Sequence, residues 1–197
     1  MEETPLTIVF DEVTKHIDLA KNELSPERVK EIQELNTTYR DLISLNADVP
    51  LAPNQINGRL SEQVKKLKES GNAMYKKNQF PDAIKMYSLA IEMALKRAPW
   101  EAAAYAREEL SVLYSNRAQT YMSMNSWGEA IVDADAAIFL KRSFGKAHYR
   151  KGKCLQSMGR LQEAKAAYEL GLELASPDGN DSELKAALSD VNGLLGM

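Results

Sequence analysis

The chain has 197 residues, 44% hydrophobic and 27% charged, enough to bury one core with a small extension. A net charge of -3 excludes the broad basic surface of a protein that coats nucleic acid. No stretch approaches the roughly 18 to 20 apolar residues of a membrane span, and we expect neither a span nor a signal peptide. Cys154 is the only cysteine, so no disulfide can form within the chain.

The first 58 residues are predicted to form a small separate unit. The run LTIVF, at residues 6–10, is its one β-like stretch, and Ser25 with Pro26 favours the start of a helix. Apolar residues then recur at helical spacing from Val29 to Ile43, and residues 46–58 indicate a linker. The unit is too short to enclose this stripe. It either packs on the following domain or binds a partner, and we favour a partner.

Three later segments repeat one pattern of small and aromatic residues. The pattern places Gly71, Ala118 and Gly152 at equivalent positions, and the last two are 34 residues apart. Tyr87 and Tyr168 are expected to fill the wider gaps between repeats. Small residues allow helices to cross closely, and we expect six at such contacts: Gly71, Ala83, Ala118, Ala130, Gly152 and Ala164. The period and pattern resemble the tetratricopeptide repeat (TPR), a helix–turn–helix unit, and predict an all-α solenoid.

The resemblance predicts a TPR domain over residues 59–197, preceded by the partner-docking unit and linker at 1–58. A capping helix at about residues 181–195 would shield the last repeat. The first two repeats are 47 residues apart, and the alanine- and glutamate-rich sequence around Pro99 predicts longer facing helices there. The repeats are placed at about residues 64–97, 111–144 and 145–178.

The first helices of successive repeats line one groove in such an array, so binding residues are expected on them. Lys68 and Asn72 are four residues apart and share a face of the first of these helices. Lys146 and Arg150 have the same spacing in the third, and Asn116 lies in the second. Cations and amides at these places offer donors to an anion, and Arg150 can hold a carboxylate through its planar fork. The sequence therefore predicts a site for one or two carboxylates.

The segments LKESGN, LYSNRA and GKAHYRKG, which carry these five residues, resemble the dicarboxylate clamp of chaperone-binding TPR domains. The resemblance implies that the groove binds the acidic C-terminal tail of a heat-shock chaperone, typically ending Glu-Glu-Val-Asp. It assigns the terminal carboxylate to Lys68, Asn72 and Asn116. Lys146 and Arg150 would then take the acidic side chains.

Other kinds of site have little support in the sequence. His148 has no second ligand at metal spacing, since His16 lies in the other unit, so no metal site is expected. No nucleophile with a base and no glycine-rich phosphate loop is present, so we expect no enzyme and no cofactor. The run KRSFGKAHYRKGK could instead bind phosphate, but the remaining surface is too acidic for a nucleic-acid track. Groove-wall residues such as Tyr75, Gln119 and Lys153 are expected to set selectivity.

Residues 61–176, together with the short unit before them, resemble the peripheral TPR subunits of the fungal Sec complex, which imports completed proteins into the endoplasmic reticulum. The resemblance implies an adaptor on the cytosolic face of that membrane, held by a membrane-anchored Sec subunit. It would receive seventy-kilodalton heat-shock chaperones. The stripe from Val29 to Ile43 and the LTIVF run would contact the membrane-anchored subunit. The alternative is a soluble clamp-type co-chaperone without a membrane partner, which would lose nothing on deletion of residues before about Leu60.

Overall fold

The computed structural model describes residues 8–11, 16–19, 26–44, 56–98, 101–174 and 182–196. Side chains are described for residues 26–40, 56–98, 101–174 and 182–196. Contacts between Cα atoms group the chain into two units, Met1–Ala52 and Pro53–Met197.

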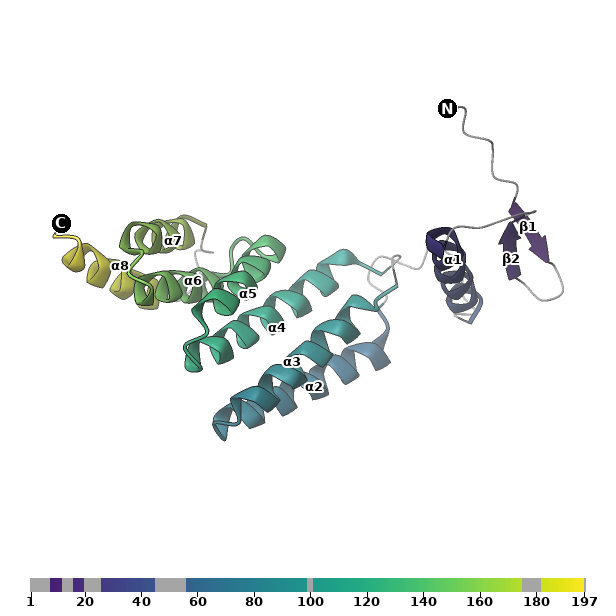
Figure 1. Ribbon diagram of the computed structural model, residues 1–197, viewed down its shortest axis with the longest axis horizontal. Coiled ribbons are helices and arrows are strands. Elements are labelled where there is room, and N and C mark those ends of the chain that lie inside the picture. Colours follow the sequence, from purple (N-terminus) through teal and green to yellow (C-terminus); the bar gives the residue numbers. More distant parts are fainter. Residues whose placement is uncertain are drawn as a thin grey trace, which may run out of the picture. The chain divides into compact units, whose positions relative to one another are not determined.

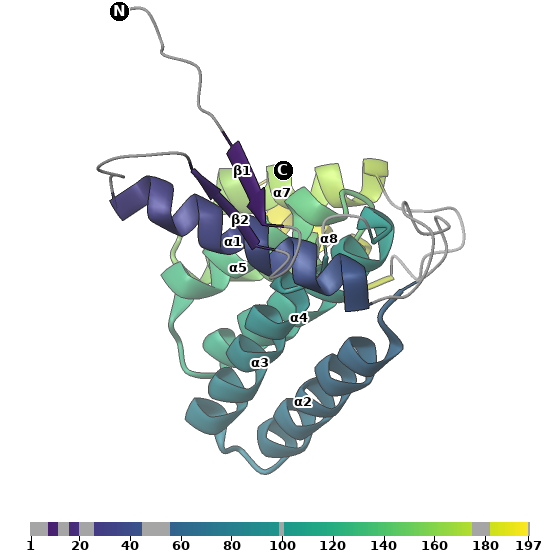
Figure 2. The same ribbon diagram turned by 90° about the vertical axis from the view of Figure 1, so that its right-hand side faces the viewer.

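The described residues of the first unit form a two-stranded antiparallel sheet and one helix. Strand β1 (Ile8–Asp11) pairs with β2 (His16–Leu19), with Ile8 opposite Leu19. Helix α1 (Pro26–Ser44) contacts β2 (Figure 2). The helix begins at the proline where the sequence predicts it, and β1 includes three residues of the LTIVF run.

The predicted apolar stripe of α1 is only partly covered. Val29 is 38% exposed and Leu35 is 45% exposed, whereas Asn36 is buried. Ile32 is half-buried, and the side chains at the end of the stripe, Leu42 and Ile43, lie outside the described residues. The described part of this helix therefore presents apolar surface that the unit itself does not bury.

The second unit is an all-α solenoid of three helix pairs and a final helix (Figure 1). Each helix contacts the next along the chain, and α4 also contacts both α2 and α6, so the first helices of the three pairs lie side by side. The helices are α2 (Gly58–Lys76), α3 (Phe80–Leu95), α4 (Ala103–Ser123), α5 (Trp127–Leu140), α6 (Gly145–Ser157), α7 (Leu161–Leu174) and α8 (Ser182–Leu194).

Equivalent turns join the two helices of each pair. Asn78 and Asn125 both have φ of 59°, and Gly159 has φ of 76°. These residues are separated by the same 47 and 34 positions as the repeats. Asparagine and glycine tolerate this left-handed conformation, which ends one helix and turns the chain back along the next.

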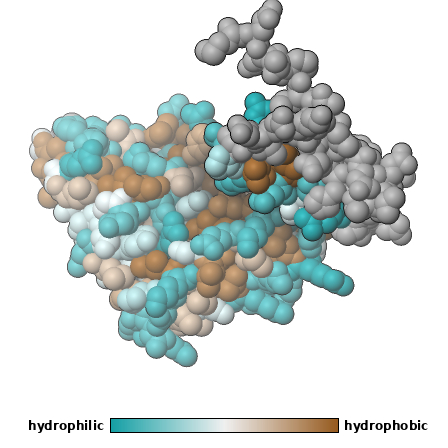
Figure 3. Space-filling view, turned by 45° about the vertical axis from the view of Figure 1, so that its right-hand side comes forward, coloured by the Kyte–Doolittle hydropathy of each residue, from teal (hydrophilic) through white to brown (hydrophobic). Residues whose placement is uncertain are grey.

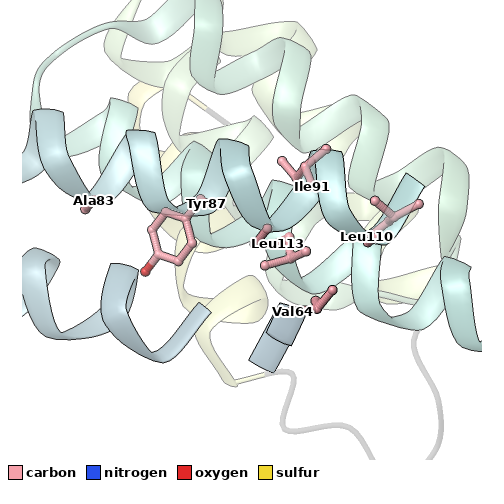
Figure 4. Packing of buried hydrophobic residues seen from close by; sticks show 8 residues of the cluster. Val64, Ala83, Tyr87, Ile91, Leu110 and Leu113 are labelled. Atoms are coloured by element: carbon pink, nitrogen blue, oxygen red, sulfur yellow. The ribbon is translucent and has the colours of Figure 1, made fainter. Parts of the chain in front are cut away.

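A glycine and a tyrosine pack together inside the first and third pairs. A Cβ added to Gly71 would lie 2.7 Å from Cε1 of Tyr87, and one added to Gly152 would overlap the ring of Tyr168 in the same way. Each ring lies over the glycine of its own repeat, because the missing side chain leaves room where the two helices cross. Tyr87 also belongs to a buried cluster that includes Leu113 of the next repeat. Figure 4 shows the Tyr87 ring reaching from α3 toward α2.

The second pair solves the same packing problem with a different pair of side chains. Ala118 and Ala134 stand at the positions of the glycine and the tyrosine, and both are fully buried. A glycine therefore faces a ring in two repeats, and buried alanines occupy both positions in the other.

Two apolar clusters hold the solenoid together. One joins α2, α3 and α4 around Tyr87, Ile91 and Leu113. The other joins α6 and α7 to α8, where Leu184 and Val191 are buried as expected for a capping helix. On the face shown in Figure 3, apolar and polar residues are interspersed.

The insertion between the first and second repeats lengthens a helix, as predicted. Helix α4 has 21 residues, whereas the corresponding α6 has 13. Arg97, whose side chain is 4% exposed, fastens this region by ion pairs to Glu101 and Glu109 and by a hydrogen bond of 2.6 Å to Ser61 Oγ. Burial alone would lower the Arg97 pKa, but hydrogen bonds to the two carboxylates raise it.

Candidate functional site

Helix α4 contacts both α2 and α6, and we call the face that these three helices share the groove. Polar side chains of α4 meet residues of both neighbours there. Ser115, Asn116, Gln119 and Ser123 lie at positions that recur about every four residues along this helix. Because α4 contacts both neighbouring helices, these side chains can meet residues from either one.

Two of the predicted site residues meet through their amides. Oδ1 of Asn72, on α2, accepts a hydrogen bond of 2.7 Å from the Tyr87 hydroxyl. The same oxygen lies 3.4 Å from Nδ2 of Asn116, which donates to it from α4. We call Asn72, Asn116 and Tyr87 the amide cluster. Both amides remain partly accessible, so the cluster can still take a ligand.

Burial raises the pKa of Tyr87 to about 12, although the nearby Arg150 guanidinium acts in the opposite direction. The phenol therefore keeps its proton at physiological pH and stays a donor in the amide cluster.

Arg150, on α6, is held by neutral acceptors. Its Nε donates to Gln119 Oε1 at 3.1 Å, and its Nη1 donates to Ser115 Oγ. Within the described ranges, no carboxylate forms an ion pair with it. Burial lowers the pKa of Arg150, opposed by the nearby Tyr75 and by Glu183 of α8. An arginine remains charged under such a shift, so the groove contains a positive charge that no ion pair neutralises.

The two lysines of the predicted site lie near these groups without contacting them. Lys68 is half-buried one turn before Asn72, and Lys146 is exposed one turn before Arg150. Neither forms an ion pair with any residue that the structure describes. Lys151, in contrast, pairs with Asp135 at 2.7 Å and therefore points away from the groove.

Several known proteins are similar to this chain over most of its length. The family described as Tetratricopeptide repeat matches residues 145–178. The ER protein translocation subcomplex subunit sec67 of Schizosaccharomyces pombe is 41% identical over 128 residues, which cover 65% of this chain and 67% of that protein. The translocation protein SEC72 of Saccharomyces cerevisiae is 33% identical over 162 residues, 81% of each chain. The chain belongs to the Sec67/Sec72 family of translocation subunits.

Solved structures support the assignment to this TPR-containing family. A chain in the cryo-EM structure of the Sec complex from S. cerevisiae matches with a TM-score of 0.64 and 30% identity, covering 96% of this chain and 98% of that one. The second TPR domain of human RPAP3, solved in complex with the HSP70 peptide SGPTIEEVD, matches with a TM-score of 0.54 and 28% identity. That match covers 68% of this chain and 98% of the RPAP3 domain.

Two groove residues of this family member were missed at the sequence level. Ser115 directly precedes the predicted Asn116 but has no charge that would single it out. Tyr87 has a place in the repeat pattern, and that pattern predicts only a packing role for it. Its second role is to hydrogen-bond the Asn72 amide. The sequence signal for that role is an asparagine at this position of the same repeat, because the third repeat, which also has a tyrosine, has Lys153 there.

Two residues of this Sec67/Sec72-family chain that often bind metals or react, a histidine and a cysteine, lie in its interior. His148 is buried, its Nε2 lies 2.8 Å from the Arg142 carbonyl oxygen, and burial lowers its pKa. Burial raises the pKa of the Cys154 thiol to about 11. The described residues contain no group of three or more potential ligands placed to hold a metal ion. Among the described helices, none combines the length and apolar character needed to cross a membrane.

Proposed function

We propose that the chain is a non-enzymatic adaptor whose groove binds the acidic C-terminal tail of a seventy-kilodalton heat-shock chaperone. The observation that carries the proposal is Arg150, a partly buried guanidinium held by Gln119 and Ser115 with no carboxylate paired to it among the described residues. A buried charge without a counter-charge is costly in the free protein. An incoming carboxylate would remove that cost and gain charge-assisted hydrogen bonds.

The groove residues divide the ligand between two positions. The amide cluster and Lys68 would hold the terminal carboxylate, because an amide can orient a carboxylate without adding repulsion between cations. Arg150 and Lys146 would take the acidic side chains that precede the C-terminus. A ligand with a single carboxylate would fill only one of these positions, so a tail with several acidic groups fits best.

The relatives support the same class of ligand and the same setting. The RPAP3 domain was solved with an HSP70 peptide ending Glu-Glu-Val-Asp, and the Sec67 and Sec72 proteins are named as translocation subunits. The adaptor would bring chaperone-bound precursors to the cytosolic face of the endoplasmic reticulum. A dissociation constant near micromolar, about -8 kcal/mol, suits a tail that must also be released. Salt would weaken binding through the exposed charges.

The decisive experiment compares the peptide SGPTIEEVD with its C-terminally amidated form, using the full chain and isothermal titration calorimetry. We expect the free acid to bind at least about tenfold more tightly, because only it carries the terminal carboxylate. Equal affinities for the two peptides would contradict the proposal. Binding of unrelated polyanions as tightly as the free acid would instead favour a phosphate-binding groove.

The first unit is proposed to bind a membrane-anchored subunit of the Sec complex through α1. The exposed Val29 and Leu35 support this role, since the fold covers each of them only in part. The double variant Val29→Asp, Leu35→Asp is expected to lose cosedimentation with endoplasmic-reticulum membranes while keeping its affinity for the peptide. A soluble co-chaperone would show no such loss.

A further inference from the structure

We propose that Tyr87 is a positioning residue of the groove: its hydroxyl fixes the Asn72 amide with the oxygen facing the protein and the nitrogen free to donate to a carboxylate. This inference rests on the proposed function and names a residue outside the five clamp positions. It concerns how the groove distinguishes a carboxylate from a carboxamide.

The orientation of the Asn72 amide follows from its partners. Tyr87 donates to Asn72 Oδ1 at 2.7 Å, and Asn116 Nδ2 approaches the same oxygen at 3.4 Å. An amide is planar, so when its oxygen faces these two donors its NH2 group points the other way. Rotating the amide by half a turn would put its NH2 group where the Tyr87 proton now finds an acceptor, and the described residues form no other hydrogen bond with that hydroxyl. A buried donor without a partner costs about 1 to 3 kcal/mol.

The tyrosine cannot move away from this position. Its ring is buried against Gly71, where an added Cβ would come within 2.7 Å of Cε1. Ile91 and Leu113 belong to the same buried cluster (Figure 4). Packing therefore fixes the hydroxyl, and the raised pKa of Tyr87 keeps it protonated and able to donate.

The three repeats provide an internal comparison. At the position of Asn72 the second repeat has Gln119 and the third has Lys153, and at the position of Tyr87 they have Ala134 and Tyr168. Tyr168 lies over Gly152 as Tyr87 lies over Gly71, but its hydroxyl donates to Gln156 Oε1 at 3.2 Å. Only the first repeat couples a packed tyrosine to a clamp amide. Tyr168 is therefore a matched control for Tyr87.

The consequence is a groove position that offers donors alone. A carboxylate oxygen can accept from the Asn72 NH2 group, whereas the NH2 group of a capped C-terminus would face another donor. Without the Tyr87 hydroxyl the Asn72 amide can rotate and present its oxygen to the groove. That oxygen would repel a carboxylate and accept from a carboxamide.

The test compares Tyr87→Phe and Tyr168→Phe in the full chain. Each variant loses one hydroxyl from a ring packed over a glycine. Calorimetry with SGPTIEEVD as free acid and as amide gives the ratio of the two affinities. We expect Tyr87→Phe to weaken the free acid about fivefold and to leave the amide unchanged, so that the ratio falls about fivefold. Tyr168→Phe should keep the ratio of the wild type.

Several outcomes would overturn the inference. A loss that is equal for both peptides in Tyr87→Phe would assign the tyrosine to stability alone, and so would an unchanged ratio. A wild-type chain that binds both peptides equally would remove the proposed function itself, which is a separate result. If Tyr87→Phe does not fold, NMR of the wild type decides. The Asn72 side-chain NH2 signals should shift when the free-acid peptide saturates the chain, and unshifted signals would contradict the inference.

Discussion

Two arginines with largely interior side chains, Arg97 and Arg150, have partners of opposite kinds, carboxylates for the first and neutral groups for the second. Arg97, beside the insertion, is paired with Glu101 and Glu109, so its charge is balanced within the fold. Arg150, in the groove, is held by a serine and a glutamine without an ion pair among the described residues. The first arrangement fixes a corner of the solenoid. The second leaves a positioned charge that can be satisfied by a ligand from outside.

A third arginine places the contrast between these two in context. Arg117 on α4 forms a two-pronged pair with the buried Asp133 of α5, at 2.7 and 2.8 Å. The hydrogen bonds to Asp133, outweighing burial, raise the pKa of Arg117. Arg97 and Arg117 therefore follow the ordinary rule that an interior charge has a counter-charge. Arg150 departs from it at the place where the sequence predicts a binding site.

The largest effect is expected from Arg97→Met, which would leave two carboxylates without their cation. Glu101 is 5% exposed, and breaking a buried pair in this way typically costs about 3 kcal/mol. Urea unfolding followed by circular dichroism should show this loss, while the folded variant keeps its peptide affinity within about twofold. Arg107→Met, at an exposed arginine on α4, is the control and should change stability little. If Arg97→Met lowered the free energy of unfolding as little as the control does, Arg97 would not stabilise the fold and would not differ from Arg150 in this respect.

Arg150→Met is expected to show the reverse pattern. The affinity for the free-acid peptide should fall at least about tenfold, because a charge-assisted hydrogen bond to the ligand is lost. The free energy of unfolding should change by less than about 1 kcal/mol, since the gain from removing an unpaired charge offsets two lost hydrogen bonds. Calorimetry and urea unfolding measure the two quantities on one sample. A variant that loses stability but keeps affinity would reverse the comparison.

The smallest effect on peptide affinity is expected from a lysine at the exposed edge of the groove. Lys146→Gln should weaken the free-acid peptide about threefold and make binding less dependent on salt, since this lysine contributes a solvated point charge. Lys151→Gln removes the same charge five residues away, from a lysine already paired with Asp135. It should leave both quantities unchanged. The dissociation constant of the peptide is measured for both variants at two salt concentrations. Equal effects of Lys146→Gln and Lys151→Gln would indicate a diffuse basic patch in place of a defined groove.

Much of the fold could be predicted because the same pattern of small residues occurs in three segments of the sequence. Gly71, Ala118 and Gly152 mark equivalent helix crossings, and the structure places all three in buried contacts. The resemblance of residues 61–176 to the peripheral TPR subunits of the fungal Sec complex is confirmed by the relatives. The five clamp residues remain a prediction, although Asn72 and Asn116 do meet across two helices.

The remaining features depend on contacts that a sequence pattern does not specify. The packing of Tyr87 within its own repeat, and its hydrogen bond to Asn72 fifteen residues earlier, follow from how α2 and α3 cross. The ion pairs of Arg97 reach twelve residues along the chain to Glu109, across a segment with no counterpart in the other repeats. In both cases the partner is set by tertiary packing, which spacing along one helix cannot reveal.

Because Tyr87 packs over Gly71, substitutions at these two positions affect both the stability of the solenoid and its binding of a ligand. Any side chain at Gly71 would displace the ring, and the second repeat shows that a larger residue there goes with a smaller one opposite, as in Ala118 with Ala134. The two positions can therefore change only as a pair. Such an exchange in the first repeat would keep the solenoid folded but remove the hydroxyl that Asn72 requires. Selection for ligand binding would then retain a glycine at position 71, although its role is only to make room for the Tyr87 ring.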